Sequence, residues 1–138
     1  MSRIFFTDRD LGKRFPILLK RAGIAVERHA DLFAPDGSDE QWLEYCGANG
    51  RIALSHNLRI RYTPNEIEAV RRHEVPLIIL IGKAPLPDLA ENFLRTRERI
   101  EAFIEQHQPP WIAKLYRPSG SAITRSSARS GRIDLWTT

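Results

Sequence analysis

The chain has 138 residues, enough for one domain with a sizeable core. Hydrophobic residues make up 42 % and charged residues 28 %, a composition that argues against an intrinsically disordered protein. No apolar run approaches the ~20 residues that a bilayer span requires, and the first residues lack the pattern of a secretory signal. Cys46 is the one cysteine, so no internal disulfide forms; together these features predict a cytoplasmic protein without a membrane partner.

The net charge of +4 is unevenly distributed. Four arginines and one aspartate follow residue 116 and give that end +3, which leaves +1 for residues 1–116. Residues 119–138 are rich in serine, arginine and glycine, so we expect a basic C-terminal tail after a domain of residues 1–118. The apolar residues Ile133, Leu135 and Trp136 leave an alternative open, in which the tail docks on this chain or on a partner.

The first half of the chain predicts strands alternating with helices. Residues 3–7 form an apolar strand, and residues 11–22 have the three-and-four spacing of an amphipathic helix. A short strand over residues 24–27 and a polar loop over residues 30–37 follow. Ser38-Asp39-Glu40-Gln41 then has the spacing of a helix capping box, and the next strand covers residues 51–55.

The second half continues the same alternation. Thr63-Pro64-Asn65-Glu66 has capping-box spacing and opens a helix that ends near His73. Residues 75–81 are apolar without alternation, which is typical of a strand covered on both faces. Pro87 opens a long helix, and residues 111–116 form a final strand. This order predicts an α/β layer fold with a mainly parallel sheet.

Polar residues occur at three strand or helix ends. Asp8 follows the first strand, Asp39 opens a helix, and Ser55-His56-Asn57 closes the strand of residues 51–55. Ligands of a parallel α/β sheet gather beyond the carboxyl ends of its strands. We therefore expect these three segments to build one site.

Two carboxylates at one point suit Mg²⁺ or Mn²⁺, which prefer oxygen ligands. Mg²⁺ usually keeps several waters and takes one or two carboxylates, so Asp8 and Asp39 would be enough to hold it. Such an ion polarises a phosphodiester and lowers the pKa of a bound water, which favours hydrolysis as the reaction class. The alternative is structural: Asp8 ends a strand, and Asp39 stabilises the first turn of a helix.

Asp10 and Glu40 are reserve metal ligands. Asp10 better suits a cap for the first helix. Glu40 is one helical step from Asp39, so we expect only one of this pair to point directly at a shared ion.

Arginines are concentrated around the third polar segment: Arg51, Arg59, Arg61, Arg71 and Arg72. Arg59 and Arg61 are the candidates for contact with RNA phosphates. A solvated charged face is the alternative.

Three segments together resemble the compact PIN-like domains: Phe6–Gly12, Ser38–Trp42 and Ile52–Arg61. The closest likeness is to the VapC-type toxins of bacterial toxin–antitoxin pairs, and it covers residues 3–117. The resemblance implies a three-layer fold, with helices flanking the sheet and an acidic site for Mg²⁺ or Mn²⁺ at the carboxyl edge. It also implies ribonuclease activity held in check by a cognate antitoxin. The expected partners are therefore this antitoxin and an RNA substrate, with a homodimer as a further option.

The resemblance also assigns individual residues. Asp8 matches the family acid after the first strand, and Asp39, with Glu40 beside it, matches the acid that opens the helix before the third strand. Asn57 falls where the family has the aspartate of its threonine–any–aspartate motif, and Ser55 replaces the threonine. Asp8, Asp39 and Asn57 are thus the expected catalytic residues.

Asn57 offers an amide oxygen without a charge. Two functions therefore stay open. One is a metal-dependent ribonuclease, and the other is a degenerate PIN-like module that binds antitoxin or RNA with little or no nuclease activity.

Overall fold

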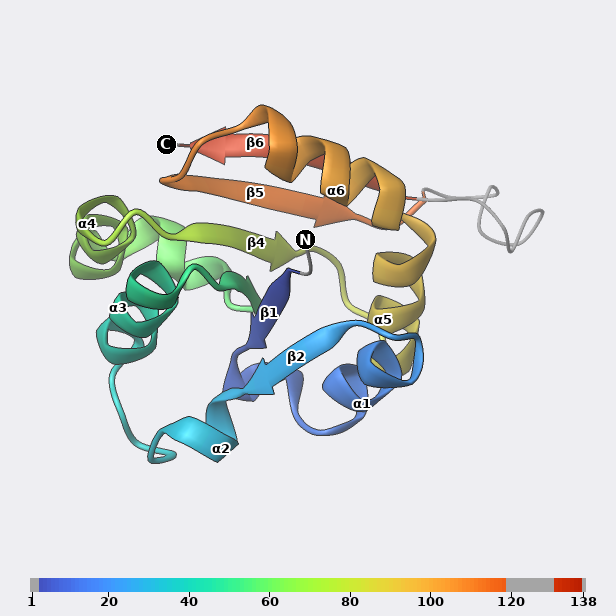
Figure 1. The fold of residues 1–138 in the computed structure, drawn as a ribbon, viewed down its shortest axis with the longest axis horizontal. Helices are drawn as coiled ribbons and strands as arrows, with labels where there is room; N and C mark the ends of the chain where they lie inside the picture. The colour runs from blue at the N-terminus through green and yellow to red at the C-terminus, as the bar shows by residue number, and fades with distance from the viewer. Residues whose placement is uncertain (1–2, 119–130, 138) are drawn as a thin grey trace.

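The computed structural model describes residues 3–118 and 131–137, and a sheet lies at its centre (Figure 1). Its strands are β1 (Ile4–Thr7), β2 (Ala25–Arg28), β3 (Ile52–Ser55), β4 (Pro76–Leu80), β5 (Trp111–Tyr116) and β6 (Arg132–Thr137). They lie in the order β2-β1-β3-β4-β5-β6. The pairs from β2 to β5 are parallel, and β6 is antiparallel to β5.

Helices cover both faces of this sheet (Figure 1). In chain order they are the 3₁₀ helix η1 (Arg9–Leu11), α1 (Arg14–Arg21), α2 (His29–Leu32), α3 (Asp39–Asn49), the 3₁₀ helix η2 (Leu58–Tyr62), α4 (Pro64–Arg72), α5 (Leu86–Arg95) and α6 (Arg97–Gln106). This arrangement confirms the predicted α/β fold, with a mainly parallel sheet between two helical layers. Among residues 3–118 and 131–137, no helix combines the length and apolar character needed to cross a membrane.

Two hydrophobic cores lie on opposite faces of the sheet. Phe5 belongs to the core under α1, α5 and α6, whereas Phe6 belongs to the core under α3 and α4. Successive side chains of a strand point to opposite faces, so a strand covered on both sides needs apolar residues at consecutive positions. This explains why β4, Pro76–Leu80, is buried along its whole length.

The predicted long helix after Pro87 is in fact two helices that meet at Thr96. Thr96 is fully buried; its hydroxyl donates to the Asn92 carbonyl oxygen at 2.7 Å and accepts the Gly131 N–H at 2.8 Å. A threonine hydroxyl that bonds a carbonyl one turn back tends to bend a helix. The predicted polar loop over residues 30–37 also differs, because its start lies in α2.

The C-terminal residues differ most from the prediction, which contained no strand beyond residue 116. β6 pairs with β5 at one edge of the sheet, and Ile133 packs against the core under α6. A Cβ added to Gly131 would lie 1.9 Å from the Tyr116 carbonyl oxygen, so glycine permits the close approach that starts this pairing. Residues 119–130 of the expected tail lie outside the described residues, and the domain boundary after residue 118 stays a prediction.

Candidate functional site

A cleft of about 470 Å³ lies at the carboxyl ends of β1 and β3. These strands are neighbours, but the chain passes through β2 on the opposite side of β1 before it reaches β3. Such a reversal of strand order opens a crevice at the carboxyl edge of a parallel sheet. The cleft is lined by Asp8, Arg9, Asp10, Asp39, His56, Asn57, Leu58 and Arg59.

Asp8 is only 4 % exposed and is held on both sides. Its carboxylate accepts the Arg9 N–H at 2.7 Å and the Ser55 hydroxyl at 3.1 Å. Burial raises the pKa of Asp8 to about 7, with smaller increases from the charges of Asp10 and Asp39 and opposition from the two hydrogen bonds. Near neutral pH the Asp8 carboxyl group therefore attracts a proton or a cation.

Asp10 joins η1 to the end of β3. Its two carboxylate oxygens lie 3.1 and 3.3 Å from the backbone nitrogen of His56, which donates its N–H to them. Burial raises the pKa of Asp10, and this bond acts in the opposite direction. The preferred capping role of Asp10 is wrong, because α1 begins at Arg14 with Lys13 as its N-cap residue, and Asp10 lies inside η1, which Asp8 caps.

Asp39 reaches the cleft from the first turn of α3. One of its oxygens accepts the Trp42 indole N–H at 3.0 Å and an Arg9 guanidinium N–H at 3.2 Å. The Arg9 guanidinium also donates to the carbonyl oxygens of Pro35 and Gly37. Arg9 therefore fixes both Asp39 and the loop that leads to it.

Glu66, in the first turn of α4, is an acid that the sequence reasoning did not assign to the site. Burial raises its pKa to about 7, and the next cause is a hydrogen bond with the Asp39 carboxyl group. Glu66 therefore brings a carboxyl group to Asp39 from a different helix. The capping-box spacing of Thr63 and Glu66 already explained an acid at that position, so Glu66 was not assigned to the site, although Thr63 makes no side-chain cap hydrogen bond in the structure.

Asn57 lines the cleft and caps η2, since its side-chain oxygen accepts the Arg59 N–H at 3.0 Å. Its own N–H donates to the Ser55 hydroxyl oxygen at 3.0 Å, and that hydroxyl donates to Asp8. The serine and the asparagine of the altered motif thus form one chain of hydrogen bonds to the buried acid.

A family model described as the PIN-like domain matches residues 4–82, more than half of the chain. The chain belongs to the PIN-like domain family. No curated protein matches it significantly, and no solved structure does. The matched segment of the PIN-like domain contains β1 to β4 and all the residues that line the cleft.

A PIN-like domain has a nuclease-type fold, and PIN domains generally depend on a divalent metal. Within the described residues, however, no three His, Cys, Asp or Glu side chains are arranged to hold an ion. The carboxylates of Asp8, Asp10 and Asp39 are still the donors that Mg²⁺ and Mn²⁺ prefer. Because Mg²⁺ keeps several waters, these residues fit a partly hydrated ion better than one enclosed by protein.

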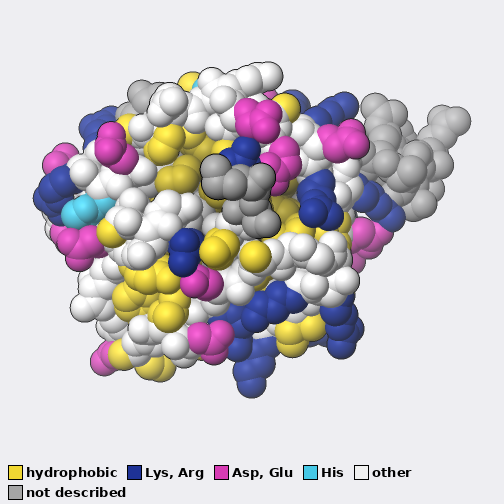
Figure 2. Space-filling model, in the orientation of Figure 1, with side chains coloured by type: hydrophobic (Ala, Val, Ile, Leu, Met, Phe, Trp, Pro, Cys, Tyr) yellow, Lys and Arg dark blue, Asp and Glu magenta, His cyan; other side chains and the backbone are white. Residues whose placement is uncertain are grey.

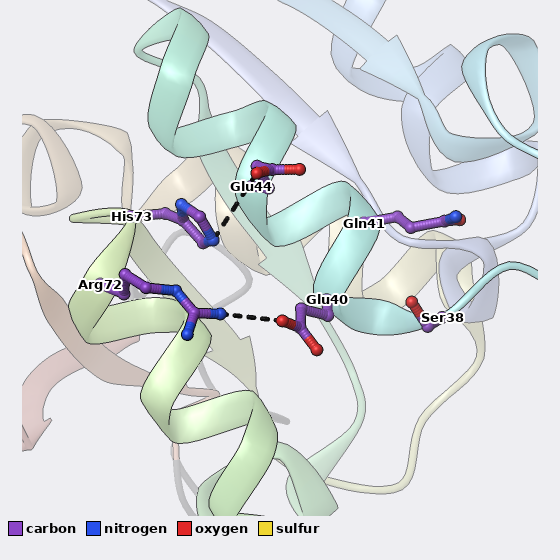
Figure 3. A pocket seen from close by; sticks show the side chains of 6 residues that line it. All are labelled: Ser38, Glu40, Gln41, Glu44, Arg72 and His73. Atoms are coloured by element: carbon purple, nitrogen blue, oxygen red, sulfur yellow. Dashed lines mark hydrogen bonds and ion pairs between the residues drawn. The ribbon is translucent and has the colours of Figure 1, made fainter.

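Glu40 does not line the cleft with Asp8, Asp10 and Asp39. It forms an ion pair of 2.8 Å with Arg72 in a separate cavity between α3 and α4, where Glu44 and His73 approach to 4.0 Å (Figure 3). Consecutive residues of a helix point in directions about 100° apart. Asp39 and Glu40 therefore face different cavities.

The arginines expected to meet RNA have different surroundings in the PIN-like domain. Arg59 lines the cleft, whereas Arg51 forms an ion pair with Glu27 at 2.8 Å. The side chain of Arg61 lies outside what the structure describes. On the face in Figure 2, Lys and Arg side chains gather over α1, whose last turn contains Lys20 and Arg21.

Proposed function

We propose that the chain is a metal-dependent ribonuclease that hydrolyses RNA phosphodiester bonds, and that it acts in the cytoplasm as the toxin of a toxin–antitoxin pair. The observation that carries this proposal is the gathering of four acids from three separate segments. Asp8, Asp10 and Asp39 line one cleft, and Glu66 bonds to Asp39. Carboxyl groups with strongly raised pKa values are typical of functional sites, because burying like charges together has no structural benefit.

In the proposed site, Asp8 and Asp39 would hold Mg²⁺ or Mn²⁺, and Asp10 stays a reserve ligand whose carboxylate accepts the His56 N–H. When bound, such an ion polarises the phosphodiester and lowers the pKa of a water on it. Ser55 orients Asp8 through its hydroxyl, and Arg9 orients Asp39 through its guanidinium. Arg59 offers a cation to an RNA phosphate at the cleft. We propose the same role for Arg61 from its position in the sequence.

The second candidate is a PIN-like module that binds antitoxin or RNA but has little nuclease activity. It is favoured by Asn57, which brings no charge where related domains are expected to have an acid. Glu66 argues for the enzyme instead, because it brings a carboxyl group to Asp39 from a different helix. We therefore place the ribonuclease first.

Cleavage of a single-stranded RNA by the purified protein in Mn²⁺ or Mg²⁺ tests the enzyme. We expect Asp8→Asn to lower the rate by at least about 100-fold, more than the loss of a ligand-orienting group usually causes. Lys20→Ala is the matched control, because α1 lies outside the cleft. RNA that stays intact in either metal, with the wild-type protein folded, would favour the binding module.

Expression of the wild-type chain and of Asp8→Asn in a bacterial host tests the toxin role. We expect growth arrest with the wild-type chain alone. Normal growth in both cultures, at equal protein levels, would contradict a toxin even if the protein cleaves RNA in vitro.

A further inference from the structure

A surface of alternating rings and cations lies beside the acidic cleft. Its members come from η2, β5 and β6, and we name them the aromatic strip: Tyr62, Lys114, Tyr116, Arg132 and Trp136. Neither the cleft nor the acidic site uses any of them.

The strip is continuous through ring contacts. The Lys114 ammonium lies 4.4 Å from the centre of the Trp136 ring and 5.6 Å from that of Tyr116. The Arg132 guanidinium lies 4.3 Å from the centre of the Tyr116 ring. Tyr62 meets Trp136 edge-on, with ring centres 6.3 Å apart. Each of the two strand rings thus has a cation over it.

The strip is accessible. Tyr62 is 70 % exposed and Arg132 is exposed, while Lys114, Tyr116 and Trp136 are half-buried. Trp136 packs against the core under α3 and α4, whereas α6 lies on the opposite side of β5 and β6 (Figure 1). The rings therefore lie on the face of these two strands that α6 leaves open.

The short helix η2 joins the strip to the cleft. Leu58 and Arg59 at its start line the cleft, and Tyr62 at its end contacts Trp136. With a 3₁₀ rise of about 2 Å per residue, Leu58 and Tyr62 are about 8 Å apart along the helix. A ligand in the cleft can therefore extend onto the strip.

We propose that the aromatic strip binds single-stranded RNA next to the cleft, with a base stacking on the exposed Tyr62 ring and phosphates meeting Lys114 and Arg132. This inference rests on the proposed ribonuclease function. Unpaired bases expose the ring faces that aromatic side chains stack on, and cations among the rings suit the RNA backbone. An RNA duplex hides those base faces, and an acidic polypeptide lacks them. Asp134 pairs with Arg132 at 2.6 Å and reduces the positive charge of the strip.

Binding without cleavage tests the strip separately from the chemistry. The probe is a fluorescein-labelled oligouridine of about 12 nucleotides, within the usual site sizes of such surfaces. Its anisotropy is measured with the full-length Asp8→Asn protein in EDTA. We expect Tyr62→Ala and Lys114→Ala each to weaken binding by about five-fold or more, whereas Tyr62→Phe, which keeps the ring, binds like the parent. Asp134→Asn should bind more tightly, because it removes the charge opposite Arg132.

Lys20→Ala is the matched control for Lys114→Ala, since it removes one cation from α1. Equal weakening by both variants would mean diffuse charge attraction and would overturn the inference. So would unchanged affinity in Tyr62→Ala, or equal affinity of the strip for a polyglutamate peptide or an RNA duplex of matched charge. RNA binding at the strip without cleavage by the wild type would refute the proposed ribonuclease alone. Cleavage without any dependence of binding on the strip would refute this inference alone.

Discussion

At the scale of single residues, Asp8, Asp10 and Glu66 lie where the folded chain disfavours their charge. Asp8 and Glu66 both have pKa values of about 7, mainly because of burial, and each has other acids nearby. Native Asp8 therefore binds a proton between about pH 4 and pH 7, whereas the unfolded chain has already released it. Stability must fall as the pH rises through this range, since the native state binds more protons than the unfolded state.

We predict that Asp8→Asn reduces this loss of folding stability at higher pH. At about pH 8 the variant should be more stable than the wild type by up to a few kcal/mol, and near pH 4 the two should be similar. Mn²⁺ should raise the melting temperature of the wild type at pH 8 more than that of Asp8→Asn. Thermal melts at both pH values check this; a wild type that is stabilised between pH 4 and pH 8 relative to the variant would contradict it.

Asn57 gives a second prediction at this scale. Asn57→Asp keeps the side-chain oxygen that accepts the Arg59 N–H, so η2 should stay capped. It adds a carboxylate to the cleft, and we expect tighter Mn²⁺ binding by about ten-fold, which calorimetric titration measures. Leu58→Asp is a control that adds one carboxylate to the same cleft. An unchanged affinity in Asn57→Asp would show that the asparagine is no electrostatic handicap.

At the scale of elements, the sequence predicts a strand or helix best where the residues of that element determine its range. Strand β5 matches its predicted range because, apart from Lys114, its residues Trp111–Tyr116 are all apolar or aromatic. The sequence did not predict the break between α5 and α6 at Thr96, and it did not predict strand β6, for a common reason. The Thr96 hydroxyl accepts the Gly131 N–H, a contact between residues far apart in the sequence. A serine- and arginine-rich composition pointed to a tail, although Ile133 and Leu135 alternate with Asp134 and Trp136 as in a strand.

The candidate site follows the same rule. Asp8, Asp39 and Asn57 could be singled out because each directly follows a strand or opens a helix. The parallel sheet then brings such ends to one edge. The bond between Asp10 and His56, and the contact between Glu66 and Asp39, depend on how separate elements pack. The spacing of residues along the sequence does not reveal such contacts between separate elements.

We predict that β6 is part of the folding unit. A chain of residues 1–118 loses the pairing with β5 and the Gly131 N–H that the buried Thr96 hydroxyl accepts. Its melting temperature should fall by about 10 °C or more, the effect of several kcal/mol in a domain of this size. The control is a chain of residues 1–137, which keeps β6. An unchanged melting temperature for residues 1–118 would show that these residues fold independently, as the sequence predicts.

At the scale of the whole molecule, topology and chemistry meet at one edge of the sheet. The strand order reverses around β1, so the cleft opens between β1 and β3. Strand β6 is antiparallel to β5, so its first residue, Arg132, pairs with Tyr116 at the carboxyl end of β5. One end of the aromatic strip therefore lies at the same edge of the sheet as the acidic cleft, and η2 connects the cleft to Trp136 through Tyr62.

Arg9 connects the loop before α3 to an acid of the cleft. Its guanidinium holds the carbonyl oxygens of Pro35 and Gly37 and the carboxylate of Asp39 together. If the Arg9 side chain is lost, the loop before α3 loses these contacts at Pro35 and Gly37, and the Asp39 carboxylate keeps the Trp42 indole as a partner. The position of Asp39 in the cleft therefore depends on a residue at the end of the first strand as well as on its own helix.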